Sequence, residues 1–270
     1  MSSQPFKFSG ARSVYYENYL GPFLFEPYGK EMARRASFIH AGSVLEMACG
    51  TGRVTRHLRN QLPTSVKLVA SDLSPDMMNV AQVKFNQSDA TEFILADMQN
   101  LPMNENSFDL VVCQFGIMFP PDKQKVFDEA YRVLKPGGQF LFSTWDKIEN
   151  VGIFNLIFNE HVIPFFKGED TSRFLVPFSL YDTRQLNNFL LHSKFSNTKL
   201  EQVVLKGIGR SAEDLVKGFF TTHSVGEEVA ARNPEEFELI AERMEKEIRA
   251  RFSDKPECEL SAFYGAGVKR

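Results

Sequence analysis

The sequence predicts an α/β fold whose sheet is mainly parallel and is covered by helices on both faces. Two observations predict it. Strand and helix patterns alternate regularly over residues 43–145, and the first strand runs into a turn that contains Gly50 and Gly52. Parallel neighbours need crossover connections, and right-handed crossovers place helices on both faces. A chain of 270 residues suits one large domain, or a core domain that carries a cap.

The alternating part begins with an apolar strand at 43–47 and a helix at 52–62. A second strand at 66–72 is followed by a helix that Ser74 caps and Pro75 opens, positions that both residue types prefer. We expect the other strands of this part at 92–97, 108–114 and 139–145, with an amphipathic helix over 122–135 that stops at Pro136-Gly137-Gly138.

The two ends of the chain follow different patterns. Residues 12–38 predict helices that break near Gly21-Pro22 and at Pro27, since proline removes an N–H donor. After Asp146 the regular alternation fails. We expect helices at 183–192, at 211–220 and from Asn233-Pro234 to Phe252, and strands at 198–207 and 257–268.

Composition limits the classes of function and location. The net charge is −3, whereas a protein that neutralises a phosphate backbone is usually basic, so we expect no nucleic-acid partner. The three cysteines form no Cys-x-x-Cys pair, which suits a reducing cytoplasm. We find no signal-peptide pattern and no apolar stretch long enough to span a membrane. The 26 phenylalanines fill either a core or an aromatic pocket.

The turn after the first strand is the strongest functional signal. Val44-Leu-Glu-Met-Ala-Cys-Gly-Thr-Gly52 ends a strand and leads into a helix, and ligands of open α/β sheets bind at the carboxyl ends of strands. Gly50 and Gly52 let a ligand approach the backbone, and the helix N-terminus offers free amides. Asp72 ends the second strand, where a carboxylate accepts both hydroxyls of a ribose.

Asp97 ends the third strand in the same way as Asp72 ends the second. A carboxylate at this place accepts a hydrogen bond from the exocyclic amine of adenine, and apolar side chains suit the faces of its ring. Leu73, Met77 and Met98 are the candidate walls. Together with the glycine turn, these residues predict a site for an adenosyl ligand.

In these features the sequence resembles the class I S-adenosylmethionine-dependent methyltransferases, particularly the small-molecule branch that includes quinone-biosynthesis methyltransferases. The resemblance covers roughly residues 40–145, in the family's order. The residues that carry it are Glu46-Met-Ala-Cys-Gly-Thr-Gly52, Asp72, Asp97-Met98, Asn106-Ser-Phe-Asp109 and Leu134-Lys-Pro-Gly-Gly138. The resemblance implies a Rossmann-like sheet of seven strands whose last strand is antiparallel, with 198–207 and 257–268 as the sixth and seventh strands.

The resemblance also implies a role for each matching residue. The loop from Ala48 through Cys49 to Gly52 would hold the methionine part of the cofactor, S-adenosyl-L-methionine, with Glu46 beneath it. Ala48 is a departure, because many members have glycine there. The other implied cofactor contacts are Asp72 at the ribose, Asp97 and Met98 at the adenine, Gln114 and Phe115 beside the methionine amino group and sulfonium, and Tyr19 from the N-terminal side.

Segments outside this core are expected to cover the cofactor. We expect an N-terminal helical lid over 1–40, a cofactor-binding core over 41–147, and a half over 148–270 that completes the sheet. Mainly helical cap insertions are expected at about 149–180 and 208–232. Tyr15, Tyr19, Phe23 and Phe25 would approach the pocket from the lid, and Phe119, Trp145, Phe154, Phe158, Phe165 and Phe166 would line it elsewhere. Packing of these rings within the cap is the alternative.

Methyl transfer from a sulfonium is an in-line displacement, so the enzyme mainly has to place the acceptor against the methyl carbon and exclude water. The expected acceptor is an O, N or C atom of a small, aromatic or apolar molecule. His161 and His223 are the candidate general bases, with His192 as a third histidine outside the core. We expect no metal, because no histidine has a partner at ligand spacing. A monomer or homodimer is expected.

Two other classes of function share some of these features. A nicotinamide-dependent oxidoreductase also carries an acidic residue after its second strand, but it expects a third glycine where this turn has Thr55. A non-catalytic module that binds an adenosyl ligand would keep every cofactor position. Turnover separates such a module from an enzyme.

Overall fold

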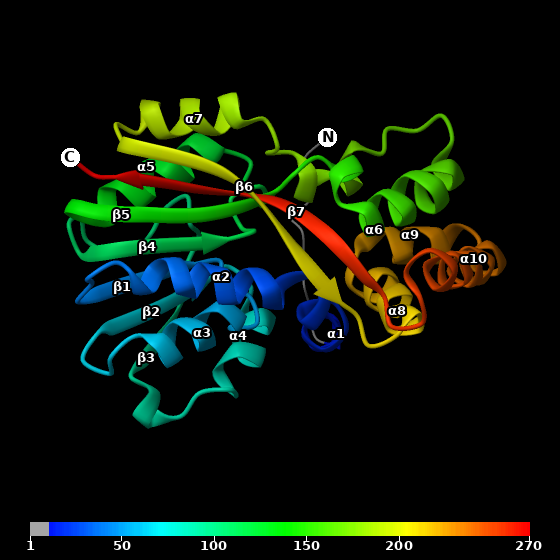
Figure 1. The fold of residues 1–270 in the computed structure, drawn as a ribbon, viewed down its shortest axis with the longest axis horizontal. Helices are drawn as coiled ribbons and strands as arrows, with labels where there is room; N and C mark the ends of the chain where they lie inside the picture. Colours follow the sequence, from blue (N-terminus) through cyan, green and yellow to red (C-terminus); the bar gives the residue numbers. More distant parts are fainter. Residues whose placement is uncertain (1–10) are drawn as a thin grey trace.

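The centre of the protein is one seven-stranded sheet with the order β3-β2-β1-β4-β5-β7-β6, as the computed structural model of residues 11–270 shows (Figure 1). The strands are β1 Ser43–Met47, β2 Lys67–Asp72, β3 Thr91–Leu95, β4 Phe108–Gln114, β5 Leu134–Trp145, β6 Ser196–Ile208 and β7 Glu257–Val268. Strands β1 to β5 pair in parallel, whereas β7 pairs antiparallel with both β5 and β6. The predicted fold class is therefore confirmed, including its antiparallel last strand.

Helices connect and flank these strands. The α-helices are α1 Ala11–Tyr15, α2 Glu26–Ser37, α3 Arg53–Gln61, α4 Pro75–Gln82, α5 Lys123–Val133, α6 Gly152–Phe154, α7 Thr183–His192, α8 Ala212–Thr222, α9 Ser224–Arg232 and α10 Pro234–Phe252. Two segments are π-helical, η1 Tyr16–Phe25 and η4 Asn155–Val162. Short 3₁₀ turns are η2 Gln87–Asp89, η3 Ile148–Asn150, η5 Ile163–Phe166, η6 Ser172–Phe174 and η7 Val176–Phe178.

Alternate residues of β5 show that helices cover both faces of the sheet. Phe140 and Phe142 contact Phe127 of α5, with ring centroids 5.7 and 5.2 Å apart. Trp145 points to the opposite face, because side chains alternate along a strand. There its ring lies 5.3 Å from the ring of Tyr28 in α2.

Residues 11–37 form one continuous helical run, so the predicted breaks at Gly21-Pro22 and Pro27 are wrong. Pro22 has no N–H to donate, but η1 stays helical with bonds that reach five residues back, as from the Glu26 N–H to the Gly21 carbonyl. Pro27 stands in the first turn of α2, where an N–H needs no partner within the helix. Residues 1–10 of the expected lid lie outside the described residues.

Among the differences from the sequence prediction are one end each of β3 and β5, and one helix. β3 ends at Leu95, because Asp97 beyond it forms only an isolated bridge. β5 begins at Leu134, since Pro136-Gly137-Gly138 belong to the extended strand and do not separate it from α5. Helix α9 was not predicted, because its N-cap is His223, a residue type that sequence rules do not favour there.

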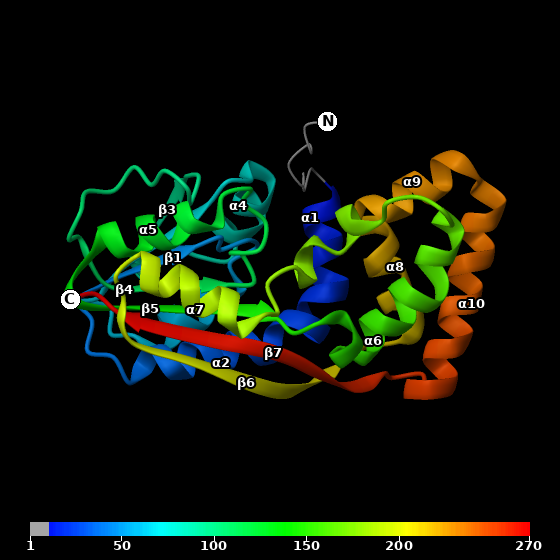
Figure 2. The same ribbon diagram turned by 90° about the horizontal axis from the view of Figure 1, so that it is seen from above.

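Strands β6 and β7 are long, and they continue past β5 toward α8, α9 and α10 (Figures 1 and 2). The β5 pairing of β7 ends at Ala262, whereas the pairing between β6 and β7 continues to Glu257 and Ile208. The three helices pack on one another, and η1 packs on α8. Two unbroken strands therefore join these helices to the sheet. The expected division into lid, core and C-terminal half stays a proposal.

Asp146 attaches the end of β5 to the outer strands. It is 4% exposed, and three side chains donate to its Oδ2 at 2.8 Å: Asn150, Gln202 and Ser261. Burial raises the pKa of this carboxyl, but the hydrogen bonds outweigh burial and hold the pKa below its usual value. The carboxylate is thus the form that the fold favours.

Asp146→Asn is expected to lower the free energy of unfolding by about 2 kcal/mol, because an amide nitrogen cannot accept from the donors that a carboxylate satisfies. Denaturant unfolding measures this change. Asp182→Asn is the control, since Asp182 is the half-buried N-cap of α7, where asparagine caps equally well. If the two substitutions cost the same, the Asp146 cluster does not stabilise the fold.

Candidate functional site

The carboxyl ends of β1, β2 and β3 meet at one edge of the sheet. The sheet order reverses between β1 and β4, which is where open α/β sheets bind ligands. The Cys49 N–H donates to the Ser71 carbonyl at 2.9 Å, and the Ala96 N–H donates to the Asp72 carbonyl at 2.9 Å. The loop after β1 therefore lies beside the end of β2, and Asp97 lies just beyond.

The loop from Ala48 to Gly52, called the glycine loop below, has a left-handed backbone at three positions. The φ angles are +53° at Ala48, +56° at Gly50 and +77° at Gly52. A Cβ on Gly50 would meet no atom within 4 Å, so the space above this residue is open to a ligand. A Cβ on Gly52 would lie 2.9 Å from the Cβ of Ala81, so that glycine lets α3 and α4 pack closely.

Ala48 adopts a conformation that favours glycine, so Ala48→Gly is expected to raise the free energy of unfolding by about 0.5–1 kcal/mol. Glycine relieves the strain of a left-handed alanine, and this gain in free energy exceeds the cost of the greater conformational entropy that glycine gives to the unfolded chain. Thermal unfolding measures the change. Ala70→Gly is the control, because Ala70 is buried in β2 with no positive φ, and there glycine is expected to destabilise. A destabilised Ala48→Gly variant would contradict the prediction.

Asp72 ties the glycine loop to the end of β2. Its Oδ2 accepts a hydrogen bond from the Gly50 N–H at 2.7 Å, and its Oδ1 accepts one from the Ser74 N–H at 2.8 Å. Burial raises the pKa of this carboxyl, and the backbone donors act in the opposite direction. The Leu73 backbone also donates to this carboxyl. A carboxylate has about four acceptor sites, so three backbone donors leave capacity for a donor from a ligand.

The predicted adenine contacts, Asp97, Leu73, Met77 and Met98, differ in burial and surroundings. Asp97 Oδ1 accepts from the Gln99 N–H at 2.8 Å. Met77 is buried and Met98 is half-buried, whereas Leu73 is 63% exposed. A Cβ on Gly116 would lie 3.5 Å from Met98 Cε and 2.5 Å from Ala48 Cβ, so the turn after β4 adjoins the glycine loop.

Two buried acceptor atoms lie on the neighbouring strands β1 and β4. Glu46 Oε2 and Gln114 Oε1 accept no hydrogen bond from any of the residues 11–270. Burial raises the pKa of the Glu46 carboxyl to about 8, and the Asp72 charge acts in the same direction. Gln114 Nε2 is 3.4 Å from the Phe25 carbonyl, so its oxygen is left to accept from a ligand. Both atoms suit a ligand that donates hydrogen bonds.

An aromatic cavity of about 100 Å³ lies next to the turn after β4. Phe115 follows β4 and its ring stacks on that of Trp145, with centroids 4.0 Å apart and planes 8° from parallel. The other residues that line this aromatic cavity are Tyr16, Leu20, Leu24, Phe25, Met118, Phe119, Phe154, Phe158, Pro177, Phe178, Phe219, Thr222 and His223. This volume is smaller than that of an apolar cavity that admits one benzene, which is roughly 150 Å³.

The sequence anticipated much of this lining. Phe25, Phe119, Trp145, Phe154 and Phe158 line the cavity as expected. Phe23 is instead fully buried, and Phe165 and Phe166 pack on one another away from the cavity lining.

Tyr19 faces a different neighbour from the one expected. Its ring stacks on Tyr15 with centroids 5.6 Å apart, and Lys217 Nζ of α8 lies 5.3 Å from it. A Cβ on Gly218 would lie 2.8 Å from Tyr19 Cβ, so Tyr19 packs against α8. Its cofactor contact stays a prediction. Sequence reasoning missed Tyr16, which lines the aromatic cavity, and Glu17, which contacts the glycine loop.

Comparison with known proteins relates the part of the chain that carries this site to a family. Residues 44–138 match a family model described as a methyltransferase domain. Residues 44–138 form a methyltransferase domain. The family predicted from the sequence is thereby confirmed, and the match contains the glycine loop, Asp72, Asp97 and Phe115.

Relatives and solved structures agree with the methyltransferase domain. The chain is 34% identical over 113 residues to the ubiquinone/menaquinone biosynthesis C-methyltransferase of Rickettsia prowazekii, covering 40% of this chain and 46% of that protein. It is 38% identical over 101 residues to the malonyl-[acyl-carrier protein] O-methyltransferase of Hahella chejuensis, covering 37% and 36%. The chain spans half the length of these curated relatives or less. The phosphoethanolamine N-methyltransferase 2 of Haemonchus contortus shares the fold with a TM-score of 0.60 and 18% identity, covering 95% of this chain and 56% of that one.

The two candidate bases lie at different places relative to the methyltransferase domain. His223 lines the aromatic cavity, and its Nδ1 accepts from the Val225 N–H at 3.4 Å. Burial lowers its pKa to about 4, although a hydrogen bond with the Phe174 backbone acts in the opposite direction. His161 lies outside the cavity lining, with its Nε2 3.5 Å from Glu247 Oε2. The role of either histidine as a base stays a proposal.

The cysteines near the methyltransferase site are held as thiols. Burial raises the pKa of Cys113 to about 12 and that of Cys49 well above its usual value, so neither is an activated nucleophile.

Within residues 11–270, no group of three His, Cys, Asp or Glu side chains is placed to hold a metal ion. Nor does any helix in that range combine the length and apolar character needed to cross a membrane.

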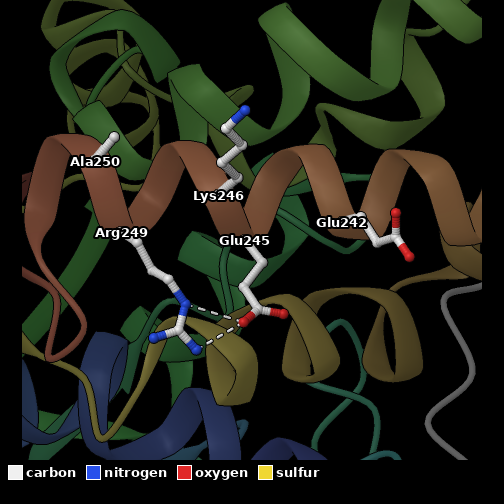
Figure 3. A pocket seen from close by; sticks show the side chains of 5 residues that line it. All are labelled: Glu242, Glu245, Lys246, Arg249 and Ala250. Carbon is white, nitrogen blue, oxygen red and sulfur yellow. Dashed lines mark hydrogen bonds and ion pairs between the residues drawn. The ribbon is translucent and has the colours of Figure 1, made fainter.

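A second depression lies on α10, outside the methyltransferase domain. Glu242, Glu245, Lys246, Arg249 and Ala250 line it. Figure 3 shows their side chains along one helix, with Arg249 Nη2 2.7 Å from Glu245 Oε1. Glu245 and Arg249 are i,i+4 partners on a solvated helix face, which explains their arrangement without a ligand.

Proposed function

We propose that this protein is an S-adenosyl-L-methionine-dependent methyltransferase that methylates an O, N or C atom of a small, aromatic or apolar molecule. The observation that supports it most is the position of Phe115. This residue belongs to the turn that adjoins the glycine loop, and its ring also lines the aromatic cavity. A cofactor on the glycine loop and an acceptor in the aromatic cavity would thus both lie next to Phe115.

The residues at the strand ends fit the cofactor. Open space above Gly50 would receive its methionine part, and the acceptor capacity left on Asp72 would take a ribose hydroxyl. The unpartnered oxygens of Glu46 and Gln114 match the hydrogen bonds that an ammonium group donates. When bound, the cofactor supplies a methyl group activated by a sulfonium.

The aromatic cavity would orient the acceptor and exclude water. Nearly all of its lining is apolar, so a charged acceptor would lose hydration without gaining a partner. Tyr16, Thr222 and His223 are the polar groups at its wall, and one of them would hold the polar atom of the acceptor. The named relatives methylate carbon and oxygen, and the solved structure is an N-methyltransferase, so the acceptor atom stays open.

The proposal is tested with calorimetry and with turnover. Wild-type protein is expected to bind S-adenosyl-L-homocysteine, and no binding would refute the proposal. Turnover is then tested with methyl-deuterated cofactor and a panel of small aromatic metabolites, read by mass spectrometry. Binding without labelled product from any acceptor would favour the non-catalytic module.

The remaining predictions concern location and partners. A cytoplasmic location rests on the cysteine pattern, and the absence of a nucleic-acid partner rests on the net charge of −3. A monomer or homodimer is proposed, which sedimentation distinguishes from larger assemblies.

A further inference from the structure

The π-helix η1 contacts the glycine loop through Glu17. Glu17 Oε2 accepts a hydrogen bond from Thr51 Oγ1 at 2.5 Å. Its Oε1 accepts from Arg53 Nη2 at 2.7 Å and lies 2.7 Å from Lys84 Nζ. Lys84 Nζ also donates to the Thr51 carbonyl at 2.8 Å. One carboxylate therefore joins the N-terminal helix, the centre of the glycine loop and the start of α3.

These contacts are shielded from solvent. The side chains of Glu17, Arg53 and Lys84 are 18%, 16% and 26% exposed, so their charges interact more strongly than those of a surface pair. The Arg53 guanidinium packs directly on Gly21, where a Cβ would overlap it. Arg53 also donates to Glu26 Oε2 at 2.6 Å. The N-terminal helix is thus seated on α3 along two of its turns.

The same helix forms one wall of the aromatic cavity. Tyr16, Leu20 and Leu24 line the cavity and are four residues apart, so they share one face of η1. Glu17 and Gly21 are offset from them by one residue and share the adjacent face, which contacts Arg53. A shift of this helix would therefore change the glycine loop and the cavity together.

We propose that Glu17 is a positioning residue that couples the glycine loop to the aromatic cavity, an inference that rests on the proposed function. Cofactor on the loop stabilises the seated N-terminal helix, and the seated helix completes the cavity for the acceptor. Because coupling between two sites is reciprocal, loss of the Glu17 contacts weakens cofactor binding and also disconnects the cavity from it. Glu17 acts through Thr51, Arg53 and Lys84.

Two measurements on wild type and Glu17→Ala test the coupling with S-adenosyl-L-homocysteine as the probe. Calorimetry is expected to give a dissociation constant about tenfold higher for Glu17→Ala. Hydrogen–deuterium exchange of residues 11–25 is expected to slow on binding in the wild type and to change little in the variant. Trp145, the single tryptophan of the chain, stacks in the cavity wall, so its emission should respond to binding only in the wild type.

Matched variants distinguish loss of the coupling between the glycine loop and the aromatic cavity from loss of the folded structure. Thr51→Val removes the hydroxyl that donates to Glu17 and is expected to reproduce the loss of protection, whereas Thr51→Ser is expected to restore it. Glu31→Gln is the control, since Glu31 is 16% exposed and pairs with Arg34 and Arg35 on α2, away from the loop. Equal protection and equal affinity in wild type, Glu17→Ala and Thr51→Val would overturn the coupling by Glu17 but leave the proposed function intact. Absence of binding by the wild type would instead refute both the proposed function and the coupling.

Discussion

Asp72→Ala is expected to weaken binding of S-adenosyl-L-homocysteine by at least about 100-fold. Asp72 accepts from the Gly50 N–H at 2.7 Å and, in the proposed complex, also accepts from the ribose. A hydrogen bond to a charged group contributes about 1.5–3 kcal/mol, and tenfold in affinity corresponds to about 1.4 kcal/mol. Loss of two or more such bonds exceeds the tenfold effect expected for Glu17→Ala. Calorimetry measures the dissociation constants.

Two further variants show whether the loss of affinity in Asp72→Ala is specific to the Asp72 carboxylate. Asp72→Asn keeps one acceptor oxygen and is expected to lose about tenfold. Asp76→Ala removes a carboxylate from the first turn of α4, beyond the strand end, and is expected to stay within about twofold of wild type. Equal binding by Asp72→Ala and wild type would remove Asp72 from the cofactor site and leave it as a loop-stabilising residue.

Raising the pH from 5 to 8 is expected to destabilise the wild type relative to Glu46→Gln by about 3 kcal/mol in total. Burial raises the pKa of Glu46 to about 8, so the folded state keeps a proton that the unfolded state releases near pH 4.5. The stabilising contribution of the protonated form is complete below the unfolded pKa and is lost as pH rises through the folded pKa. Each pH unit within this window changes stability by up to about 1.4 kcal/mol.

Denaturant unfolding at several pH values measures this difference. The free energies of wild type and Glu46→Gln should agree within about 1 kcal/mol at pH 5 and diverge toward pH 8, since glutamine does not titrate. Glu92→Gln is the control, because Glu92 lies on the edge strand β3 and is exposed. Parallel curves for wild type and Glu46→Gln would show that Glu46 is ionised throughout the window.

The core of the fold was predictable because its signals are local. β1 and β4 have the predicted bounds, and Ser74 caps α4 by accepting from the Met77 N–H at 3.3 Å, as the Ser-Pro pattern indicates. The break expected at Gly21-Pro22 failed because a π-helical register accommodates proline, and nothing in the sequence marks that register. The glycine loop was predictable from its strand and turn. Its left-handed Ala48 was not, since alanine rarely adopts that conformation.

The parts of the site that depend on distant contacts were not predictable. Tyr16 and Glu17 resemble ordinary residues of an amphipathic helix. Glu17 has its role through Thr51 and Arg53, and Tyr16 lines a cavity whose other walls come from distant segments. Tyr19 was chosen because it is an aromatic residue of the expected lid, but the rotation of η1 directs it to Lys217. A resemblance that covers only the core gives no information on how this helix is rotated.

The interior position of β7, between β5 and the edge strand β6, has a consequence for how the protein acquires its fold. β7 is the last strand in sequence, yet it lies between β5 and β6. During synthesis, β6 therefore has no strand to pair with until residues 257–268 have left the ribosome. Until then β5 presents an open, aromatic-rich edge, and exposed strand edges promote aggregation. Variants truncated before β7 should therefore accumulate as insoluble protein even though their methyltransferase domain is complete in sequence.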